Sequence, residues 1–586
     1  MKTIGDILRE QAAVRPEALA IAAPGQAPLS YAELLERAEL LAGTLAMTGL
    51  QAGDRVAVVL PDGPELTVAI LAVSAAFGCA PLNPRYRREE FLFYLSDVKA
   101  RRVITAMGVG DAAREAADEL GIEVSEVGDL LPDDQGGRYR MPLEAGSDDI
   151  AVLLHTSGTT DRPRLVPLRH RNLLAVAENK ASSMALTPVD LCLCVMPLFH
   201  MHGIAVLLGS LFSGGGIACT AFSAPEFFGW VQELRPTWYT ASPTVHQAIL
   251  RQAARYPQVV AARPFRFIRS ASAPMPTPVM AEMEQTWGVP VLDFYGLTEA
   301  STSAGHLPGA KHKPGSVGLP IGTAIATMSD QGEILPPGQI GEIVIRGENV
   351  MSGYEGNPEA NASVFRDGWL RTGDEGYLDE EGYLFVCGRL KEMINRGGEK
   401  ISPCEVDDAL LRHPAVAEAV TFAIPDPILG EDVGAAVVPR EGVQVDELSL
   451  RLAVAERLAD FKVPRRIVFL DELPRSATGK LERIGLAERL GLGAADQKQK
   501  AAPTEYVAPR TETEAVLADI WAEVLGLELV GVNEDFLELG GDSLLAARVI
   551  ARARVAFEQD LSVIEFFDRP TVAEQAELVQ AGAVKV

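Results

Sequence analysis

The sequence predicts three folded parts: a large α/β part with mainly parallel sheets at residues 1–390, a small α+β part at 391–490, and an all-α, four-helix part at 511–586. Before Gly388, short apolar runs alternate with helical patterns. Residues 491–510 are poor in large apolar side chains and are typical of a tether. Only helical periodicity follows this linker. A length of 586 residues fits three or four folding units of roughly 150 residues each.

In the large part, short β-branched or apolar runs predict strands at 56–60, 102–105, 238–240 and 267–269, with helices at 31–49 and 281–287. Such alternation is typical of βαβ units, which form parallel sheets. Residues 203–225 carry no charge and are long enough to span a bilayer, but three glycines at 214–216 interrupt them. A helix, a tight turn and a strand fit that stretch better.

The small part begins after Gly388 and carries strand patterns near 420–424 and 433–438. The last part begins with Thr511 and Glu514, whose spacing predicts a capping box at a helix start. We expect one face of this helix to be apolar, formed by Ala515, Val516, Ile520, Trp521 and Val524.

Composition and charge limit the classes of function. The chain is 47% hydrophobic and 23% charged, as in ordinary globular proteins, and its net charge of −27 argues against nucleic acid or an anionic membrane as a partner. The six cysteines lack zinc spacing and predict reduced, buried thiols. Asp6, Arg9 and Glu10 interrupt any secretory signal near the start, so we expect a cytoplasmic protein.

A loop rich in hydroxyls and glycine follows the apolar segment 150–154. It reads Thr156, Ser157, Gly158, Thr159 and Thr160, with Arg162 and Arg164 after it. Glycine lets the backbone close around an anion, and exposed N–H groups add partial positive charge. The loop is a candidate phosphate cradle, although a cluster of this kind is also common in plain connecting loops.

Three further segments offer the groups that an ATP site needs. Residues 293–299 supply an aromatic face, a hydroxyl and the Glu299 carboxylate, a suitable ligand for Mg²⁺. Asp374 ends the segment 369–374 and suits two ribose hydroxyls, and Lys480 follows a small turn. Alone, each has a structural alternative: a helix-start carboxylate, a turn residue and a solvated surface lysine.

With these motifs in this order, residues 1 to about 490 resemble the adenylate-forming enzymes: acyl-CoA synthetases, nonribosomal peptide adenylation domains and luciferases. The resemblance extends to the segments 29–33, 53–56, 341–343 and 388–394. It implies an enzyme, an acid–thiol ligase, with a large domain and a small lid domain that alternates between two half-reactions.

The resemblance implies a role for each motif. It assigns ATP binding to Thr156, Ser157, Gly158, Thr159, Thr160, Arg164, Asp293, Tyr295, Asp374 and Arg389; catalysis to Thr298, Glu299, Lys391 and Lys480; and a thiol tunnel to Gly397 and Gly398. Tyr295 would stack on adenine, with Asp293 near its amino group. Asp374 and Arg389 would hold the ribose, Glu299 would hold Mg²⁺, Lys480 would bridge the two reacting anions, and Lys391 would be the hinge.

The phosphate loop departs from the family pattern. Where the family has glycine, any residue, proline, lysine and glycine, this chain has residues 161–165, with Asp161, Arg164 and Leu165 at the departing positions. Arginine still supplies a cation, but with a geometry different from that of lysine. Asp161 adds a negative charge, and Leu165 removes backbone freedom, so we expect weaker or slower use of ATP.

Residues 536–545 resemble the attachment site of acyl and peptidyl carrier proteins. Ser543 would then carry a covalent 4′-phosphopantetheine arm, attached by a phosphopantetheinyl transferase. The alternative is a plain helix start with a serine cap. A carrier also implies a downstream acyl-accepting enzyme: a condensation, ketosynthase or tailoring enzyme of a natural-product pathway, such as a nonribosomal peptide synthetase.

The acid is expected to lack a charged α-amine. Enzymes of this group that activate amino acids place aspartate after a phenylalanine, whereas His200 follows Phe199 here. We assign His200, His202, Gly203, Ser270 and Ala271 to the acid pocket, although the two histidines also fit packed core positions. The stretches 238–246, 267–273 and 395–400 look closest to small-acid ligases of the oxalyl-CoA synthetase kind.

Three functions remain open. The first is acyl-AMP formation followed by loading of the chain's own carrier. The second is a free CoA ligase with an appended carrier. The third is a scaffold that presents the carrier while its ligase part has degenerated, for which Asp161 and Leu165 are the support.

Overall fold

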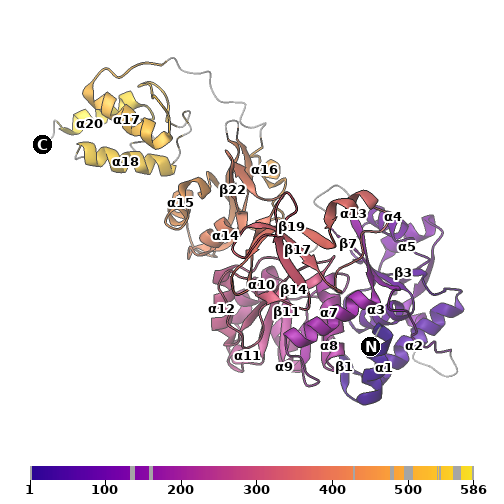
Figure 1. Cartoon of the computed structure of the whole chain (residues 1–586). Helices are drawn as coiled ribbons and strands as arrows, with labels where there is room; N and C mark the ends of the chain where they lie inside the picture. The colour runs from indigo at the N-terminus through magenta and orange to yellow at the C-terminus, as the bar shows by residue number, and fades with distance from the viewer. Residues whose placement is uncertain are drawn as a thin grey trace. The chain divides into compact units, whose positions relative to one another are not determined.

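The structure is a computed structural model of the whole chain (Figure 1). It describes residues 3–131, 139–156, 163–426, 429–475, 481–493, 506–536, 539, 541, 543–557, 566 and 569–583, without the side chains of 543, 544, 547 and 581–583. The chain forms two compact units, Met1–Lys391 and Glu392–Val586.

The larger sheet of the first unit is mainly parallel. Its strand order is β15-β14-β13-β12-β11-β9-β10-β1-β2, and the pairs from β13 through to β1 are parallel. Most of the central strands are buried on both faces, which explains why their sequences are short and mostly apolar, although β12 also buries Arg269 and Ser270. The strands are β1 Leu19–Ala22, β2 Leu29–Ser30, β9 Leu191–Cys194, β10 Gly216–Cys219, β11 Trp238–Ala241, β12 Phe267–Ala271, β13 Val291–Leu297, β14 Ser301–Gly305 and β15 Leu319–Pro320.

A second sheet of the same unit, ordered β6-β5-β3-β4-β7-β8, is parallel except for the final β7–β8 hairpin. Its strands are β3 Arg55–Val58, β4 Gly78–Pro81, β5 Arg102–Thr105, β6 Glu123–Glu126, β7 Ile150–Thr156 and β8 Arg164–Arg169. The predicted α/β class with mainly parallel sheets is confirmed. Four of the six cysteines are buried in this unit, and all six are free thiols.

Helices pack on both sheets, and α7 and α8 pack on each other. The uncharged stretch 203–225 forms most of α8, a turn and β10, as predicted. No helix in the described residues combines the length and the hydropathy that a membrane crossing requires. The helices of this unit are α1 Ile4–Val14, α2 Tyr31–Met47, α3 Pro64–Ala76, α4 Arg88–Asp97, α5 Asp111–Glu119, α6 Val127–Leu130, α7 His170–Ser183, α8 Met201–Phe212, α9 Phe227–Leu234, α10 Pro243–Ala253, α11 Pro257–Ala261, α12 Thr277–Trp287 and α13 Pro358–Val364.

The last strands of the first unit along the chain form an antiparallel sheet, which the sequence patterns did not predict. Its strands are β16 Ala324–Met328, β17 Gly341–Arg346, β18 Phe365–Arg366, β19 Trp369–Leu378 and β20 Leu384–Arg389. Strand β19 is rich in polar and glycine residues and buries few of its side chains. Such a strand gives almost no apolar signal, which is why the sequence resembles a loop there.

The second unit begins with a small sheet flanked by helices. The hairpin β23–β24 is its centre, and β25 pairs with β24 in parallel. The two strands predicted near 420–424 and 433–438 are confirmed. The elements are β21 Ile394–Arg396, β22 Glu399–Ile401, α14 Pro403–Leu411, β23 Val416–Asp426, β24 Gly430–Pro439, α15 Glu447–Ala455, a 3₁₀ turn Asp460–Lys462, β25 Arg466–Phe469 and α16 Leu486–Arg489.

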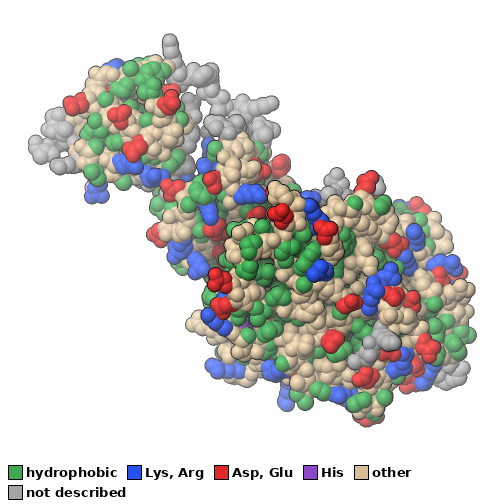
Figure 2. Space-filling view, in the orientation of Figure 1, with side chains coloured by type: hydrophobic (Ala, Val, Ile, Leu, Met, Phe, Trp, Pro, Cys, Tyr) green, Lys and Arg blue, Asp and Glu red, His purple; other side chains and the backbone are tan. Residues whose placement is uncertain are grey.

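The last part is helical, as predicted, and its described residues hold α17 Glu512–Leu525, α18 Ser543–Phe557 and α20 Val572–Ala583. The Thr511–Glu514 capping box is present. The buried face of α17 was only partly predicted, because Leu517, Ala518, Trp521 and Val524 are buried while Ala515, Val516 and Ile520 are partly buried. Basic and acidic side chains are interspersed over the face of the molecule seen in Figure 2.

Candidate functional site

Two strands and a tyrosine build the first cluster, which we call the ribose cluster: Tyr295, Asp374 and Arg389. Asp374 on β19 lies opposite Arg389 on β20, and Arg389 Nε is 3.1 Å from Asp374 Oδ1. The Tyr295 hydroxyl, at the end of β13, donates to Asp374 Oδ2 over 2.7 Å. The sequence paired Asp374 with Arg389, but it gave no sign that the tyrosine orients the carboxylate.

Asp293 lies deeper on β13, beside Ser270 of β12. Its side chain is buried, and its Oδ1 has no hydrogen-bond partner among the described residues. Burial raises the pKa of Asp293 to about 7. A carboxyl group in this state can donate or accept a hydrogen bond near neutral pH.

A second cluster, which we call the phosphate-side cluster, consists of Arg164, Glu299 and Tyr354. The Tyr354 hydroxyl donates to Glu299 Oε1 over 2.6 Å, and the Arg164 guanidinium lies 5.2 Å above the Tyr354 ring. Burial and the nearby Glu299 raise the pKa of Tyr354. The partly buried Thr298 precedes this buried carboxylate. Sequence reasoning missed Tyr354, which lies in a loop between Gly353 and Gly356 and shows no periodic pattern.

The predicted phosphate loop joins the ends of the β7–β8 hairpin. Thr156 pairs with Arg164 across it, while Ser157, Gly158, Thr159, Thr160 and Asp161 lie outside the described residues. Leu165 is a buried residue of β8 opposite His155 and packs in the core of its sheet. The departure from glycine at this position is therefore in a strand, where a β-strand backbone accepts leucine without strain.

The residues assigned to the acid pocket lie at the start of α8 and at the end of β12. His200 occupies the N-cap position of α8 without a capping hydrogen bond from its side chain, and an added Cβ at Gly203 would lie 2.5 Å from the Pro197 carbonyl oxygen. His202 lies 2.7 Å from both Ser272 Oγ and Thr240 Oγ1, and 2.6 Å from Arg269 Nη1. Burial, helped by Arg269, holds the pKa of His202 well below its usual value, so the ring is neutral. Ser270 and Ala271 end β12 next to Arg269.

Lys180 on α7 and Arg269 on β12 are both 1% exposed. Burial lowers the pKa of Lys180 well below its usual value and that of Arg269 to about 10. Neither was singled out from the sequence, because Lys180 lies within a mixed helical pattern and Arg269 within the stretch 267–273, which was compared with small-acid ligases only as a whole.

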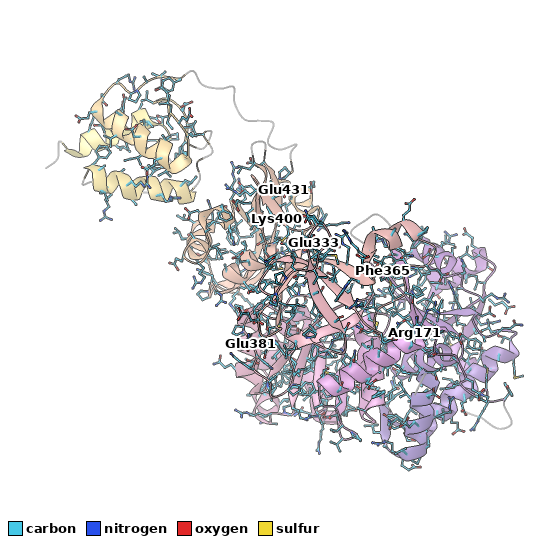
Figure 3. The ribbon with its side chains drawn as sticks, in the orientation of Figure 1. Arg171, Glu333, Phe365, Glu381, Lys400 and Glu431 are labelled. Carbon is cyan, nitrogen blue, oxygen red and sulfur yellow. The ribbon has the colours of Figure 1, made fainter. Side chains whose placement is uncertain are left out.

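The glycines assigned to the thiol tunnel form the turn between β21 and β22, with φ of 59° at Gly397 and 98° at Gly398. Both values favour glycine. The Asn395 N–H next to the turn donates to Glu431 Oε2 over 2.7 Å, and Figure 3 labels Glu431 and Lys400 on the strands of this small sheet. Lys391 is the last residue of the first unit.

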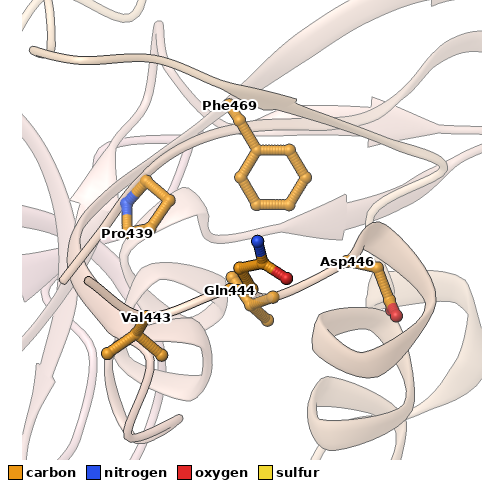
Figure 4. A pocket seen from close by; sticks show the side chains of 6 residues that line it. Pro439, Val443, Gln444, Asp446 and Phe469 are labelled. Carbon is orange, nitrogen blue, oxygen red and sulfur yellow. The ribbon is translucent and has the colours of Figure 1, made fainter. Parts of the chain in front are cut away.

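Two further assigned residues cannot be fully placed. Lys480 lies outside the described residues, and so does the side chain of Ser543, although the backbone of Ser543 begins α18. A pocket of about 410 Å³ on the small sheet is lined by Pro439, Val443, Gln444, Val445, Asp446 and Phe469 (Figure 4). None of the assigned residues lines it.

Comparison with known proteins covers nearly the whole chain. Residues 8–355 match the family described as AMP-binding enzyme, residues 405–480 match its C-terminal domain, and residues 515–579 match the phosphopantetheine attachment site. The chain is 43% identical to a probable CoA ligase of Humulus lupulus over 83% of this chain and 96% of that protein. It is 41% identical to the oxalate–CoA ligase of Arabidopsis thaliana over 83% and 98%.

Among solved structures, the ATP-bound MatB of Rhodopseudomonas palustris is similar, with a TM-score of 0.77 and 28% identity over 85% of this chain and all of that one. The large α/β part, the small β-rich part and the helical carrier part thus each correspond to a known domain. The chain belongs to the AMP-binding enzyme family: it is an adenylate-forming acid–thiol ligase followed by a phosphopantetheine carrier domain.

Proposed function

We propose that the enzyme activates a carboxylic acid as its acyl-AMP and then loads the acyl group onto the phosphopantetheine thiol of its own Ser543. The substrate carboxylate attacks the α-phosphorus of ATP and pyrophosphate leaves. The thiol, losing its proton, then attacks the acyl carbon and AMP leaves. The observation that carries the proposal is the phosphopantetheine attachment domain at 515–579, in the same chain as the ligase.

The two clusters support the first half-reaction. In our proposal the ribose cluster accepts the ribose hydroxyls, Tyr295 stacks on adenine beside Asp293, and Thr156 to Arg164 surround the β- and γ-phosphates. Thr298 and Glu299 lie at the α-phosphate. Glu299 is a buried carboxylate whose Oε1 has one tyrosine donor, which fits a hard cation, so Glu299 would hold the Mg²⁺ that neutralises phosphate charge.

The second unit supplies the remaining groups in this proposal. Lys480 neutralises the two reacting anions during adenylation, and Gly397 and Gly398 line the path of the thiol. Lys391, the last residue of the first unit, acts as the hinge. We propose domain limits of 1–390, 391–490 and 511–586, with 491–510 as the linker. The carrier requires a phosphopantetheinyl transferase and delivers its thioester to a downstream acyl-accepting enzyme of a natural-product pathway.

We propose that the acid is small and lacks an α-amine. His200 stands where an amino-acid-activating enzyme needs a carboxylate, and His202 beside it is neutral. The oxalate–CoA ligase of Arabidopsis thaliana, which is similar over nearly its whole length, makes a small acid of this kind a reasonable substrate.

The second candidate function is a free CoA ligase with an appended carrier. Its support is that the similar enzymes are CoA ligases, which align over 83% of this chain and nearly the whole of their own length. The scaffold alternative loses one of its two supports, because Leu165 is a core residue of β8.

Intact-protein mass spectrometry separates the two enzymatic candidates. The pantetheinylated protein is incubated with ATP and an acid panel, with or without free CoA. Self-loading predicts a mass increase of the acid less water, and its loss in Ser543→Ala while ATP–pyrophosphate exchange continues. Accumulation of acyl-CoA with no mass change on the protein would favour the second candidate.

A further inference from the structure

Arg55 connects three segments at the base of the phosphate loop. It begins β3, within the segment 53–56 that contributes to the family resemblance and to which the proposed function assigns no role. Both oxygens of the Glu355 carboxylate lie 2.8 Å from Arg55 Nη2, and Arg55 Nη1 donates to the Val98 carbonyl at the end of α4 over 3.2 Å. The side chains of Arg55 and Glu355 are 17% and 26% exposed, so their ion pair is partly shielded from water.

Glu355 directly follows Tyr354 of the phosphate-side cluster. Its N–H donates to the carbonyl of Leu165 on β8 over 3.2 Å. Gly353 and Gly356 flank these two residues with φ of 135° and 67°, values that favour glycine. Because a glycine on each side gives the backbone other accessible conformations, the position of Tyr354 depends on the contacts that hold its neighbour Glu355.

The same arginine is linked to the other strand of the hairpin. His155 on β7 immediately precedes Thr156, and its Nε2 lies 2.8 Å from Oδ2 of Asp97 at the end of α4. Asp97 is adjacent to Val98, whose carbonyl accepts from Arg55. Arg55 is therefore connected through α4 to the end of β7 and through Glu355 to the start of β8, the two strands that the phosphate loop joins.

Tyr354 contacts two groups that the proposed function places at the phosphates. Its hydroxyl donates to Glu299 Oε1 over 2.6 Å, and its ring lies 5.2 Å from the Arg164 guanidinium carbon. Asn361 holds the Tyr354 backbone through its N–H and its carbonyl, whereas Arg55 holds the adjacent Glu355 against β3. Since a shift of about 1 Å at a reacting group can slow a reaction about 100-fold, a loosened Glu355 affects the nucleotide before it affects the fold.

We propose that Arg55 is a positioning residue for ATP: through Glu355 it fixes Tyr354, and through Tyr354 it fixes Glu299 and Arg164 at the phosphates. The inference rests on the proposed function, which it deepens by adding a residue that acts without contacting the nucleotide or the acid. It also gives the segment 53–56 a physical role.

The test compares the full-length wild type with Arg55→Gln, Arg55→Lys and Glu355→Gln. The matched control is Arg114→Gln, because Arg114 on α5 pairs with Glu126 at 2.9 Å and also donates to a backbone carbonyl, as Arg55 does. Isothermal titration calorimetry with ATP and Mg²⁺, without acid, gives Kd for ATP. ATP–pyrophosphate exchange with the preferred acid gives KM for ATP and for the acid, and thermal melting shows which variants fold.

A double-mutant cycle tests the route through Tyr354. Tyr354→Leu removes both the hydroxyl and the aromatic face while it keeps an apolar side chain at this position. It is measured alone, with Arg55→Gln and with Arg114→Gln, because residues that act through one contact have non-additive effects.

We expect Arg55→Gln and Glu355→Gln each to raise Kd and KM for ATP about fivefold and to leave KM for the acid unchanged. Arg55→Lys should raise them less, because it keeps a positive charge opposite Glu355. Adding Arg55→Gln to Tyr354→Leu should weaken ATP binding no further than the larger single effect. Arg114→Gln should keep both constants within about twofold, because a loss of folded protein lowers the rate without changing Kd.

An Arg55→Gln protein that melts cooperatively and binds ATP with a Kd within about twofold of the wild type would overturn the inference. Additive losses in the cycle, or an equal rise of Kd in Arg114→Gln, would also overturn it. If Arg55→Gln does not fold, Glu355→Gln decides by the same criteria. Absence of exchange with every acid, while ATP still binds, would contradict the proposed function alone, and the Kd values would still decide the inference.

Discussion

Asp374→Asn removes one charge from the ribose cluster and should weaken ATP binding far more than it weakens the fold. The Asp374 side chain is 8% exposed and accepts a 2.7 Å hydrogen bond from Tyr295. Its ion pair with Arg389 is screened, because Arg389 is 46% exposed, so that pair contributes at most about 1 kcal/mol to stability. The amide keeps an acceptor for Tyr295, and we expect a total stability loss of about 1–2 kcal/mol.

The effect on the nucleotide is larger. Two ribose hydroxyls donate to the carboxylate in our account, and hydrogen bonds to a charged group are about twice as strong as neutral ones. Losing about 1–1.5 kcal/mol per bond raises KM for ATP by about 30- to 150-fold. Tyr295→Phe removes only the hydroxyl that orients Asp374 and should raise KM about fivefold.

ATP–pyrophosphate exchange at varied ATP, together with thermal melting, measures both effects. The matched control is Asp379→Asn, just beyond β19, which pairs with Lys313 instead of the ribose cluster. A KM for ATP within twofold of the wild type in Asp374→Asn would refute the assignment. Equal KM increases in the Asp374 and Asp379 variants would also refute it.

Three other perturbations test separate parts of the account. Tyr354→Phe leaves the buried Glu299 without its 2.6 Å donor, so it should slow pyrophosphate exchange about tenfold and cost about 1–3 kcal/mol of stability in thermal melting. Burial raises the pKa of Asp293 to about 7, so the folded state retains a proton that the unfolded chain releases above about pH 4. The wild type should therefore lose stability between about pH 4 and 7, and in urea unfolding Asp293→Asn should gain about 1.4 kcal/mol per pH unit relative to it. Parallel stability–pH profiles of the two proteins would contradict this. Trp521→Ala leaves a cavity in the carrier core, where Trp521 packs on Phe536 and Phe566, and should lower the carrier's free energy of unfolding by about 3–5 kcal/mol. Intact-protein mass spectrometry should then show no pantetheinylation, while ATP–pyrophosphate exchange persists.

The sequence predicted those parts of the fold whose strands are buried on both faces. β10 and β11 are short, mostly apolar runs between helices, and β12 begins with two apolar residues; this pattern indicates a parallel sheet. The antiparallel strand β19 could not be found this way, because most of its residues are polar or glycine and few of them are buried; one of its polar residues, Asp374, belongs to the ribose cluster. The capping box at Thr511 was predicted because it is local, whereas the buried face of α17 depends on the helices packed against it.

The candidate site shows the same division. Asp374 and Arg389 lie in motifs whose order carries the resemblance, so they could be predicted without a structure. The contacts of Tyr354 and Lys180 could not, because only folding brings their partners together: Tyr354 donates to Glu299, and Lys180 and Arg269 both donate to Thr302. A lysine in a helix carries no sign of burial until its neighbours are known.

Loading of the carrier within one chain is tested most directly by a competition in one tube. Pantetheinylated protein, ATP, the preferred acid and excess free CoA are mixed, and the protein and the small molecules are followed together by mass spectrometry. Our account predicts that the mass of the acid less water appears on the wild-type protein first and is absent from Ser543→Ala. Steady formation of acyl-CoA, with the holo-protein mass unchanged throughout, would contradict it.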